Sequence, residues 1–374
     1  MKHLLVTNDF PPKLGGIQSY LWELWRRLDP DDVCVLSTPH QGDREFDGRQ
    51  AYRVERTRDP VLLPHPLLAR QINRLADDHG AELVLLDPAL PIGAIGPVLS
   101  SPYGLILHGA EITVPGRLWP GRLALGPILR RASLVVAAGH YPLAEAERAA
   151  GRTLASVVVP PGVDPVRFSP VDLARRAELR HDFGLPATGS VVASVSRLVP
   201  RKGMDVTIRA VARCAQQGVD VHLAIAGDGR DRARLDRLAT SVGCPVTFLG
   251  RVSDDRLADA YRLADLFVMM CRNRWFGLEQ EGYGIVFLEA AACGVAQLAG
   301  RSGGSHEAVV DGTTGLVVDE PDSVTAVAAA LVRLLADPAA LVAMGVASRH
   351  RANSEASYES RAAVLAAALA GWRA

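Results

Sequence analysis

The sequence lacks an excess of charge of either sign and is poor in cysteine. Its 374 residues hold 41 Lys and Arg against 41 Asp and Glu, a balance typical of a folded protein rather than one that coats nucleic acid. The five cysteines form no CxxC pair, and their odd number favours reduced thiols over disulfides or a metal site. The N-terminal apolar run is too short for a signal peptide, and no apolar run reaches the roughly eighteen residues that span a bilayer. We therefore expect a cytoplasmic protein that binds no nucleic acid.

Motifs for a dinucleotide, for an ATP phosphate chain and for a metal ion are missing too. The stretch "NDFPPKLGG" at residues 8–16 has neither the GxGxxG spacing nor the Lys-Ser/Thr pair of a P-loop. The stretch "DPD" at residues 29–31 resembles a DxD metal motif, but it follows the first predicted helix and lies away from the strand ends. Helix termination explains it better, so we predict no metal site and no cofactor.

What the sequence does contain is an alternation of apolar strands and amphipathic helices. The stretch "HLLVT" at residues 3–7 predicts a buried parallel strand, and the next segment has its apolar residues on one helical face. Similar strand and helix segments follow along the chain. This alternation implies a parallel sheet that is covered by helices on both faces.

A break at residues 157–172, where four prolines and a glycine interrupt the pattern, divides the chain. The alternation restarts at "SVVASVSR", residues 190–197, and the length of the chain favours two domains. We predict an α/β protein with two Rossmann-like, doubly wound parallel-sheet domains that face a central cleft. The predicted domains are residues 1–165 and 166–356, and the last helix, 357–374, is expected to pack back on the first.

Ligands bind at the carboxyl ends of strands in such sheets, and two polar strand ends lie in the first half. Gly15 and Gly16 directly precede a helix, where they would let a phosphate or sugar approach the backbone and the helical N–H donors. His108 ends the strand "YGLILH" and could face a substrate. Taken alone, a tight turn explains the glycines and a structural role explains His108.

A third polar strand end is "SRLVPRKG", which opens the second half. Arg197 lies at the end of the strand, and Lys202 can fold back across a proline-glycine turn. Two such cations suit a diphosphate. Arg201, between them, is predicted to face solvent, and a basic surface loop is the simpler alternative.

The fourth is "EQEGYGIVFLEA", with Glu281 in a loop and Glu289 in the second turn of a helix that starts near Gly284. The helix start, with the backbone of Ile285 and Val286, lies between the two carboxylates. This arrangement suits one polyhydroxylated ligand that also carries phosphate. The spacing does not exclude a glycosidase with paired carboxyls, although a glycosidase needs neither the cations nor the glycine turns.

The region from Ile112 to Ala144 contains no acidic residue, yet it holds four arginines among apolar residues. The arginines are Arg117, Arg122, Arg130 and Arg131. This composition suits contact with an anionic membrane surface. The simpler alternative is a solvated arginine face over an ordinary core.

Taken together, these motifs resemble a retaining glycosyltransferase of the GT-B fold, in glycosyltransferase family four. The stretches "TNDFPPKLGGIQSYL", "SRLVPRKG", "EGYGIVFLEAAACGV" and "AGRSGGSHEAVVDGTTGLVVD" are similar to mannosyltransferases that transfer mannose from GDP-mannose to phosphatidyl-myo-inositol mannosides. The resemblance runs over nearly the whole chain. It implies transfer to a phosphatidylinositol monomannoside with an α-1,6 linkage, by a peripheral protein at the inner face of the cell membrane.

The resemblance also implies roles for residues at the donor. Glu281 would contact hydroxyls of the transferred sugar, and Glu289 would hold the ribose. Arg197 and Lys202 would hold the diphosphate, which the helix start at Gly284, Ile285 and Val286 would also face. His108 would lie beside the donor sugar.

Further roles concern the acceptor and the base. Gly15, Gly16 and Gln18 would close over the phosphate and the acceptor, with Asp9 near the acceptor hydroxyl. The backbone of Arg251 and Val252 would meet the base.

The chain departs from the family pattern at four positions, which are Ala110, Trp275, Phe276 and Ala296. Trp275 and Phe276 stand where glycines are common. Three alternatives remain: a family-four enzyme with another donor or a soluble acceptor, a GT-B-like sugar-nucleotide epimerase, and a regulator that only binds a nucleotide-sugar.

Overall fold

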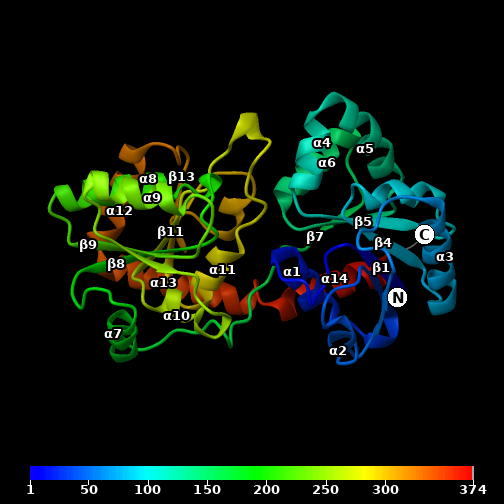
Figure 1. Ribbon diagram of the computed structural model, residues 1–374, viewed down its shortest axis with the longest axis horizontal. Coiled ribbons are helices and arrows are strands. Elements are labelled where there is room, and N and C mark those ends of the chain that lie inside the picture. Colours follow the sequence, from blue (N-terminus) through cyan, green and yellow to red (C-terminus); the bar gives the residue numbers. More distant parts are fainter. Residues whose placement is uncertain (373–374) are drawn as a thin grey trace. The chain divides into compact units, whose positions relative to one another are not determined.

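The computed structural model describes residues 1–372 and divides the chain into two compact units (Figure 1). Unit 1 comprises Met1–Gly162 and the C-terminal segment from Tyr358 onward, and unit 2 comprises Val163–Ser357. The sequence placed the boundary after residue 165, three residues beyond the observed one.

Unit 1 contains a seven-stranded parallel sheet in the order β3-β2-β1-β4-β5-β6-β7. Its strands are β1 (His3–Thr7), β2 (Val33–Ser37), β3 (Arg53–Arg56), β4 (Leu83–Asp87), β5 (Tyr103–Leu107), β6 (Leu134–Ala137) and β7 (Ser156–Val158). Its α-helices are α1 (Gly16–Trp25), α2 (Asp43–Asp47), α3 (Pro66–His79), α4 (Ala110–Arg117), α5 (Trp119–Arg131), α6 (His140–Ala150) and α14 (Tyr358–Gly371).

Alternate residues of the central strands enter two separate cores, one on each face of this sheet. Leu5 of β1 packs with α1 and with Leu365 of α14, whereas Leu4 packs with Ile72 of α3 on the opposite face. An ion pair of 2.8 Å between Arg27 and Glu359 adds to the contact between the start of α14 and the end of α1. Burial on both faces explains why these strands read as unbroken apolar runs.

Unit 2 contains a six-stranded parallel sheet in the order β10-β9-β8-β11-β12-β13. Its strands are β8 (Ser190–Val195), β9 (Val221–Ala226), β10 (Val246–Gly250), β11 (Leu266–Met269), β12 (Ala296–Gly300) and β13 (Gly315–Val318). Its α-helices are α7 (Leu173–Asp182), α8 (Met204–Gln216), α9 (Arg232–Val242), α10 (Asp259–Arg262), α11 (Ile285–Ala292), α12 (Val324–Leu335) and α13 (Pro338–Ser354).

Both sheets reverse their strand order beside their first strand, between β1 and β4 in unit 1 and between β8 and β11 in unit 2. This is the Rossmann order, and ligands bind outside the carboxyl ends of the strands at such a reversal. The predicted fold class, with two doubly wound parallel sheets, is confirmed.

In residues 1–372 no single helix is both long and apolar enough to cross a membrane. Helices α12 and α13 together meet that length and composition, but they bend by 95° at their junction.

Candidate active site

In unit 1, a buried carboxylate at the end of β4 lies next to His108, which follows the neighbouring strand β5. Parallel register pairs Thr7 with Asp87, so the last residues of β1 and β4 lie side by side. The Thr7 hydroxyl donates to Asp87 Oδ2 at 2.6 Å, and His108 Nε2 lies 2.6 Å from Asp87 Oδ1. Asp87 is fully buried. The sequence prediction missed it, although an aspartate that ends an apolar strand is a signal of this kind.

The surroundings of His108 favour its protonated form. Burial by itself would lower the pKa of His108, but the charges of Asp87, Glu111 and Asp9 outweigh burial and raise that pKa above its usual value. Glu111, also missed, accepts from the backbone N–H groups of His108 at 2.5 Å and Gly109 at 3.0 Å. The edge of the Tyr20 ring contacts the imidazole, with ring centroids 5.6 Å apart. His108 is therefore held in one orientation by charge and packing.

The loop between β1 and α1 folds around Asp9. Gln18 Nε2 donates to Asp9 Oδ1 at 2.5 Å, and Lys13 Nζ donates to the same oxygen at 2.8 Å. A Cβ atom at Gly15 would lie 2.1 Å from Gln18 Oε1, so a larger residue would displace the Gln18 side chain. Gly16 opens α1, whose N-terminus has no side-chain cap. The predicted residues Asp9, Gly15, Gly16 and Gln18 thus lie together.

Two residues that the sequence prediction missed support this loop from outside. The Arg56 guanidinium donates to the carbonyl oxygens of Pro11 at 2.7 Å and Thr38 at 3.0 Å, and it pairs with Asp47. The Asn8 side chain accepts from the backbone N–H of Leu62 at 2.7 Å. Both contacts join residues that lie tens of positions apart in sequence, which explains why no local motif revealed them.

In unit 2, Glu281 forms ion pairs with two cationic residues of the loop after β8. Lys202 Nζ lies 2.8 Å from Glu281 Oε2, and the Arg201 guanidinium contacts the same oxygen. The prediction that Arg201 faces solvent is wrong, since its side chain is only 19% exposed. Pro200 and Gly203 turn the chain so that adjacent residues can both reach Glu281, and a Cβ atom at Gly203 would lie 1.9 Å from the Met270 carbonyl oxygen.

Glu281 is ionised in this environment. Burial would raise its pKa, but Lys202 and Arg201 outweigh burial and lower the pKa below its usual value. A carboxylate that stays ionised suits hydrogen bonding to hydroxyl groups. It does not suit the proton donor of a glycosidase, which needs a raised pKa.

Arg197 lines an open pocket of about 420 Å³ together with Arg201 of this cluster. The pocket is lined by Arg197, Val199, Arg201, Asp228, Gly229, Arg230 and Glu279. Its lining holds three arginines against two acidic residues, Asp228 and Glu279, so a diphosphate would meet an excess of positive charge there. Arg230, which the sequence prediction missed, follows the end of β9 in the stretch "AGDGR".

The helix that contains Glu289 begins where the sequence predicted, between the two glutamates. Gly284 has φ 86° and precedes α11, so the backbone N–H groups of Ile285 and Val286 lie in a first turn that has no side-chain cap. Only glycine adopts such a φ readily. The N-terminus of α11 can therefore receive an anion.

Glu289, in the second turn of α11, lies in a different environment from Glu281. The Tyr261 hydroxyl donates to Glu289 Oε2, and Tyr261 is fully buried in the core of unit 2. Burial raises the pKa of Glu289, and the hydrogen bond from Tyr261 opposes that shift only in part. The sequence prediction missed Tyr261 because it belongs to a different helix, α10.

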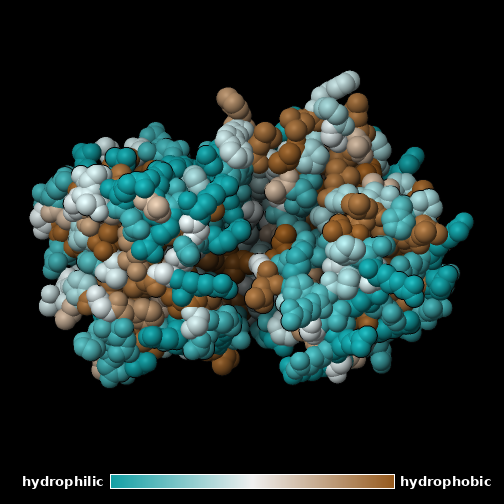
Figure 2. All heavy atoms as spheres, viewed as in Figure 1, coloured by the Kyte–Doolittle hydropathy of each residue, from teal (hydrophilic) through white to brown (hydrophobic). Residues whose placement is uncertain are grey.

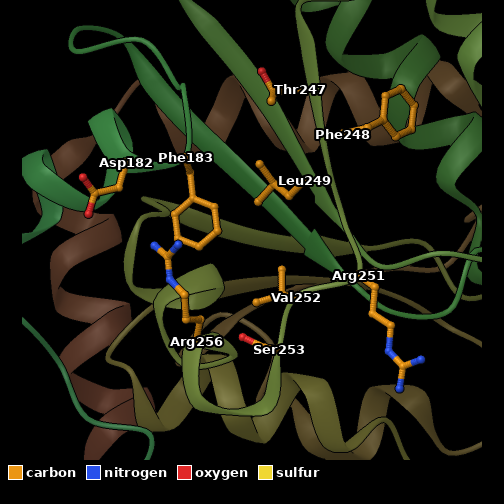
Figure 3. A pocket seen from close by; sticks show the side chains of 9 residues that line it. All are labelled: Asp182, Phe183, Thr247, Phe248, Leu249, Arg251, Val252, Ser253 and Arg256. Carbon is orange, nitrogen blue, oxygen red and sulfur yellow. The ribbon is translucent and has the colours of Figure 1, made fainter.

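Val252 and Arg251, predicted to meet a base, follow the edge strand β10 beside a second open pocket of about 460 Å³ (Figure 3). Val252 and Phe183 point into this pocket, and the Arg256 guanidinium lies 4.3 Å from the Phe183 ring centroid. Arg251 also belongs to the lining, but its side chain extends away from Phe183 and is exposed.

The arginine-rich segment of unit 1 forms α4 and α5, which carry apolar side chains on their outer surface (Figure 2). Trp119 is 77% exposed and Leu123 60%, whereas Leu125 and Leu129 of the same helix are buried. Arg117 pairs with Glu145 at 2.9 Å. Arg122 and Arg131 are exposed as well, so both the membrane contact and the solvated arginine face remain predictions.

Within residues 1–372 no group of three or more His, Cys, Asp or Glu side chains is placed to hold a metal ion. Asp29 of the "DPD" stretch instead caps the short 3-10 helix Pro30–Asp32, where its side chain accepts a hydrogen bond of 3.1 Å from the backbone N–H of Asp31.

The family described as "Glycosyl transferases group 1" matches residues 175–353 of this chain. A GDP-mannose-dependent alpha-(1-6)-phosphatidylinositol monomannoside mannosyltransferase of Mycolicibacterium smegmatis is 40% identical, over 99% of this chain and 98% of that protein. A Mycobacterium tuberculosis protein of the same description is 39% identical over 98% of each chain. Among solved structures, Anabaena Alr3699/HepE in complex with UDP has a TM-score of 0.82 at 23% identity, over 99% of this chain and 100% of that one.

Proposed function

Because the chain belongs to the group 1 glycosyl transferases, we propose that it transfers mannose from GDP-mannose to a phosphatidyl-myo-inositol monomannoside. The product has an α-1,6 linkage, and the configuration of the donor is retained. The observation that carries this proposal is the near full-length similarity to the mycobacterial enzymes of that description.

The charges of unit 2 support a donor that carries a diphosphate. In the proposed reaction the bond between the mannosyl carbon C1 and the phosphate oxygen breaks, and negative charge builds on the departing GDP. Arg197 and Lys202, with the N-terminus of α11, stabilise that charge without a metal ion or cofactor. Donors held in place before the reaction need no reorganisation when the charge appears.

Two carboxylates of unit 2 orient the donor in this proposal. Glu281 accepts hydrogen bonds from hydroxyls of the mannose while Lys202 and Arg201 hold it ionised. Glu289 accepts from the ribose hydroxyls while Tyr261 fixes its other oxygen. The backbone at Arg251 and Val252 lies against the guanine.

Residues of unit 1 bind the acceptor and the reacting sugar. Asp9 lies near the attacking hydroxyl, and Gly15, Gly16 and Gln18 form the wall beside it. The hydroxyl attacks C1 from the face that GDP leaves, and its proton passes to a phosphate oxygen of GDP. His108 lies beside the mannose, where a protonated imidazole held by Asp87 adds a hydrogen-bond donor and a positive charge.

The acceptor is a membrane lipid in this proposal, which places the protein at the inner face of the cell membrane. The exposed apolar and arginine side chains of α4 and α5 suit an anionic bilayer surface, because apolar groups enter the interface and arginines attract lipid phosphates.

A donor and acceptor screen tests this function. Purified protein is incubated with radiolabelled GDP-mannose and purified phosphatidylinositol monomannoside, and the linkage of the product is determined. We expect an α-1,6-linked dimannoside lipid. Faster transfer from UDP-sugars would contradict the proposed donor. Transfer to a soluble sugar in preference to the lipid would contradict the proposed acceptor.

A further inference from the structure

Arg272 holds the main chain of the loop that carries Arg201 and Lys202. It lies shortly after the end of β11. Its side-chain Nε donates to the Pro200 carbonyl oxygen at 3.0 Å, and its backbone N–H donates to the Arg201 carbonyl oxygen at 3.0 Å. We call residues 200–203 the cationic turn. Arg272 thus binds two successive carbonyl groups of the cationic turn.

Two acidic residues engage the remaining nitrogens of the Arg272 guanidinium. Nη2 donates to Asp205 Oδ2 at 3.1 Å and lies 3.0 Å from Oδ1, and Nη1 donates to Asp322 at 3.0 Å. The Arg272 side chain is only 14% exposed. Because a guanidinium is planar and offers its donors in a fixed fork, contacts to a carbonyl oxygen and two carboxylates fix its orientation. With every nitrogen engaged, Arg272 is placed to hold the turn rather than to contact the donor.

A chain of ion pairs continues from Arg272 to the start of the same loop. Arg234 Nη1 lies 3.6 Å from Asp205, and the Arg234 guanidinium donates to both oxygens of Asp231, at 2.6 and 2.7 Å. The backbone N–H of Asp231 donates to the Leu198 carbonyl oxygen at 3.2 Å. Side chains of alternating charge therefore connect Leu198 with the cationic turn.

We propose that Arg272 is a positioning residue for mannosyl transfer, which holds the cationic turn so that Lys202 meets the departing diphosphate and Arg201 reaches Glu281. This inference rests on the proposed function, in which Lys202 stabilises the charge that builds on GDP. Such a cation is most effective when it is in place before the charge appears. A displacement of about 1 Å at a reacting group can lower the rate about 10²-fold.

Steady-state kinetics of Arg272→Gln and Arg272→Lys with GDP-mannose test the proposal. Glutamine keeps a donor but neither the charge nor the fork, and lysine keeps the charge but offers it at a single point. We expect kcat to fall about 10²-fold in the glutamine variant and at least about tenfold in the lysine variant, because neither side chain can bind Pro200 and both carboxylates together. Wild-type kcat in Arg272→Lys would show that charge alone suffices and would overturn the proposal.

The matched control is Arg180→Gln. Arg180 of α7 is bound in the same manner, since its Nε donates to the Leu263 carbonyl oxygen at 2.9 Å and its Nη2 donates to Asp265 at 2.7 Å. Its side chain is 10% exposed, so the two glutamine variants should lose similar amounts of stability. We expect Arg180→Gln to keep the wild-type kcat at a temperature where both variants are folded. An equal fall in kcat in both variants would show a general loss of structure and would contradict a positioning role.

A double-mutant cycle shows whether Arg272 acts through Lys202. In the Lys202→Ala background, Arg272→Gln should lower kcat by a factor at least about fivefold smaller than in the wild type, because the cation that Arg272 positions is absent. Equal factors in the two backgrounds would make the two roles independent and would overturn the proposal.

Amide hydrogen exchange tests the anchoring without any substrate. The backbone N–H of Lys202 donates to the Val199 carbonyl oxygen at 3.0 Å, a bond that slows its exchange. We expect exchange in residues 198–203 to be at least about tenfold faster in Arg272→Gln than in the wild type, and unchanged in Arg180→Gln. Unchanged exchange in Arg272→Gln would overturn the anchoring. Failure of the wild type to turn over GDP-mannose would refute the proposed function instead, because hydrogen exchange requires no donor.

Discussion

Each unit carries a cluster of charged side chains at the carboxyl ends of the strands of its parallel sheet, but the two clusters are built differently. In unit 1, strand ends that are adjacent in the sheet supply a buried carboxylate, Asp87, which holds His108 at 2.6 Å. In unit 2, two cations of one loop, Arg201 and Lys202, converge on Glu281, which comes from the loop after the neighbouring strand. The first cluster raises the pKa of its cation, and the second lowers the pKa of its carboxylate. One fold thus supplies two opposite electrostatic environments.

The largest expected effect comes from the unit 2 cluster. Lys202→Ala removes a cation at the proposed diphosphate site and should lower kcat about 10²- to 10³-fold, the usual effect of losing one preorganised donor. Steady-state kinetics with GDP-mannose measures this effect. Arg175→Ala is the control, because it removes a cation from an ion pair of the same length, 2.8 Å to Glu178, that is exposed and outside the site. Wild-type turnover in Lys202→Ala would exclude Lys202 from the site.

A substitution in the unit 1 cluster should lower kcat by a smaller factor and should also change how the stability of the protein depends on pH. Asp87→Asn keeps the shape of the side chain but removes the charge that raises the pKa of His108. We expect a fall in kcat of about 10- to 100-fold, since a buried charged hydrogen bond contributes about 1.5 to 3 kcal/mol.

The same pair gives a prediction for stability. Because the folded-state pKa of His108 lies above the unfolded value of about 6.5, its contribution is full below that pH and is lost as the pH rises through the folded pKa. Thermal unfolding of the wild type should therefore show a loss of stability above about pH 6.5 that Asp87→Asn lacks. Parallel curves for the two proteins would argue against the pair.

Tyr261→Phe tests the second carboxylate of unit 2. The Tyr261 hydroxyl lowers the pKa of Glu289 against the effect of burial, so its loss should raise that pKa further. We expect KM for GDP-mannose to rise about fivefold, equivalent to one hydrogen bond of about 1 kcal/mol, with kcat little changed. The acid limb of the kcat/KM profile should move to higher pH. A fall in kcat at constant KM would place Tyr261 in the chemical step instead.

An effect of similar size, on membrane binding rather than on turnover, is expected at the outer face of unit 1. Arg122→Glu and Arg131→Glu should each weaken sedimentation with anionic vesicles about fivefold in low salt, and less in high salt, because each basic residue near such a surface contributes about 1 kcal/mol. Arg209→Glu on α8, an exposed arginine of unit 2, is the control. If all three variants bind the vesicles equally well, α4 and α5 do not form the membrane contact.

The sequence predicted well what depends on local periodicity and on position within a strand-helix unit. The apolar runs of β1 and β8 read as buried strands because both faces of a parallel sheet are covered. Gly284 marked the start of α11 because only glycine suits its φ of 86°. The sequence also placed Asp9, Gly15 and Gln18 near one another, since all three belong to one loop and the helix after it.

Contacts between distant segments were not predictable in the same way. Arg201 and Lys202 are adjacent basic residues of one exposed-looking loop, and nothing local shows that both reach Glu281, 80 and 79 positions away. Asp87 and Tyr261 were missed for the same reason, because their partners lie on other elements.

By itself, then, the sequence determined the fold class and the strand ends that carry the polar residues, because apolar periodicity sets which faces are buried. Only the tertiary structure decided the charge state and the partner of each polar residue. Those depend on burial and on distances of a few ångströms between segments that sequence spacing does not relate.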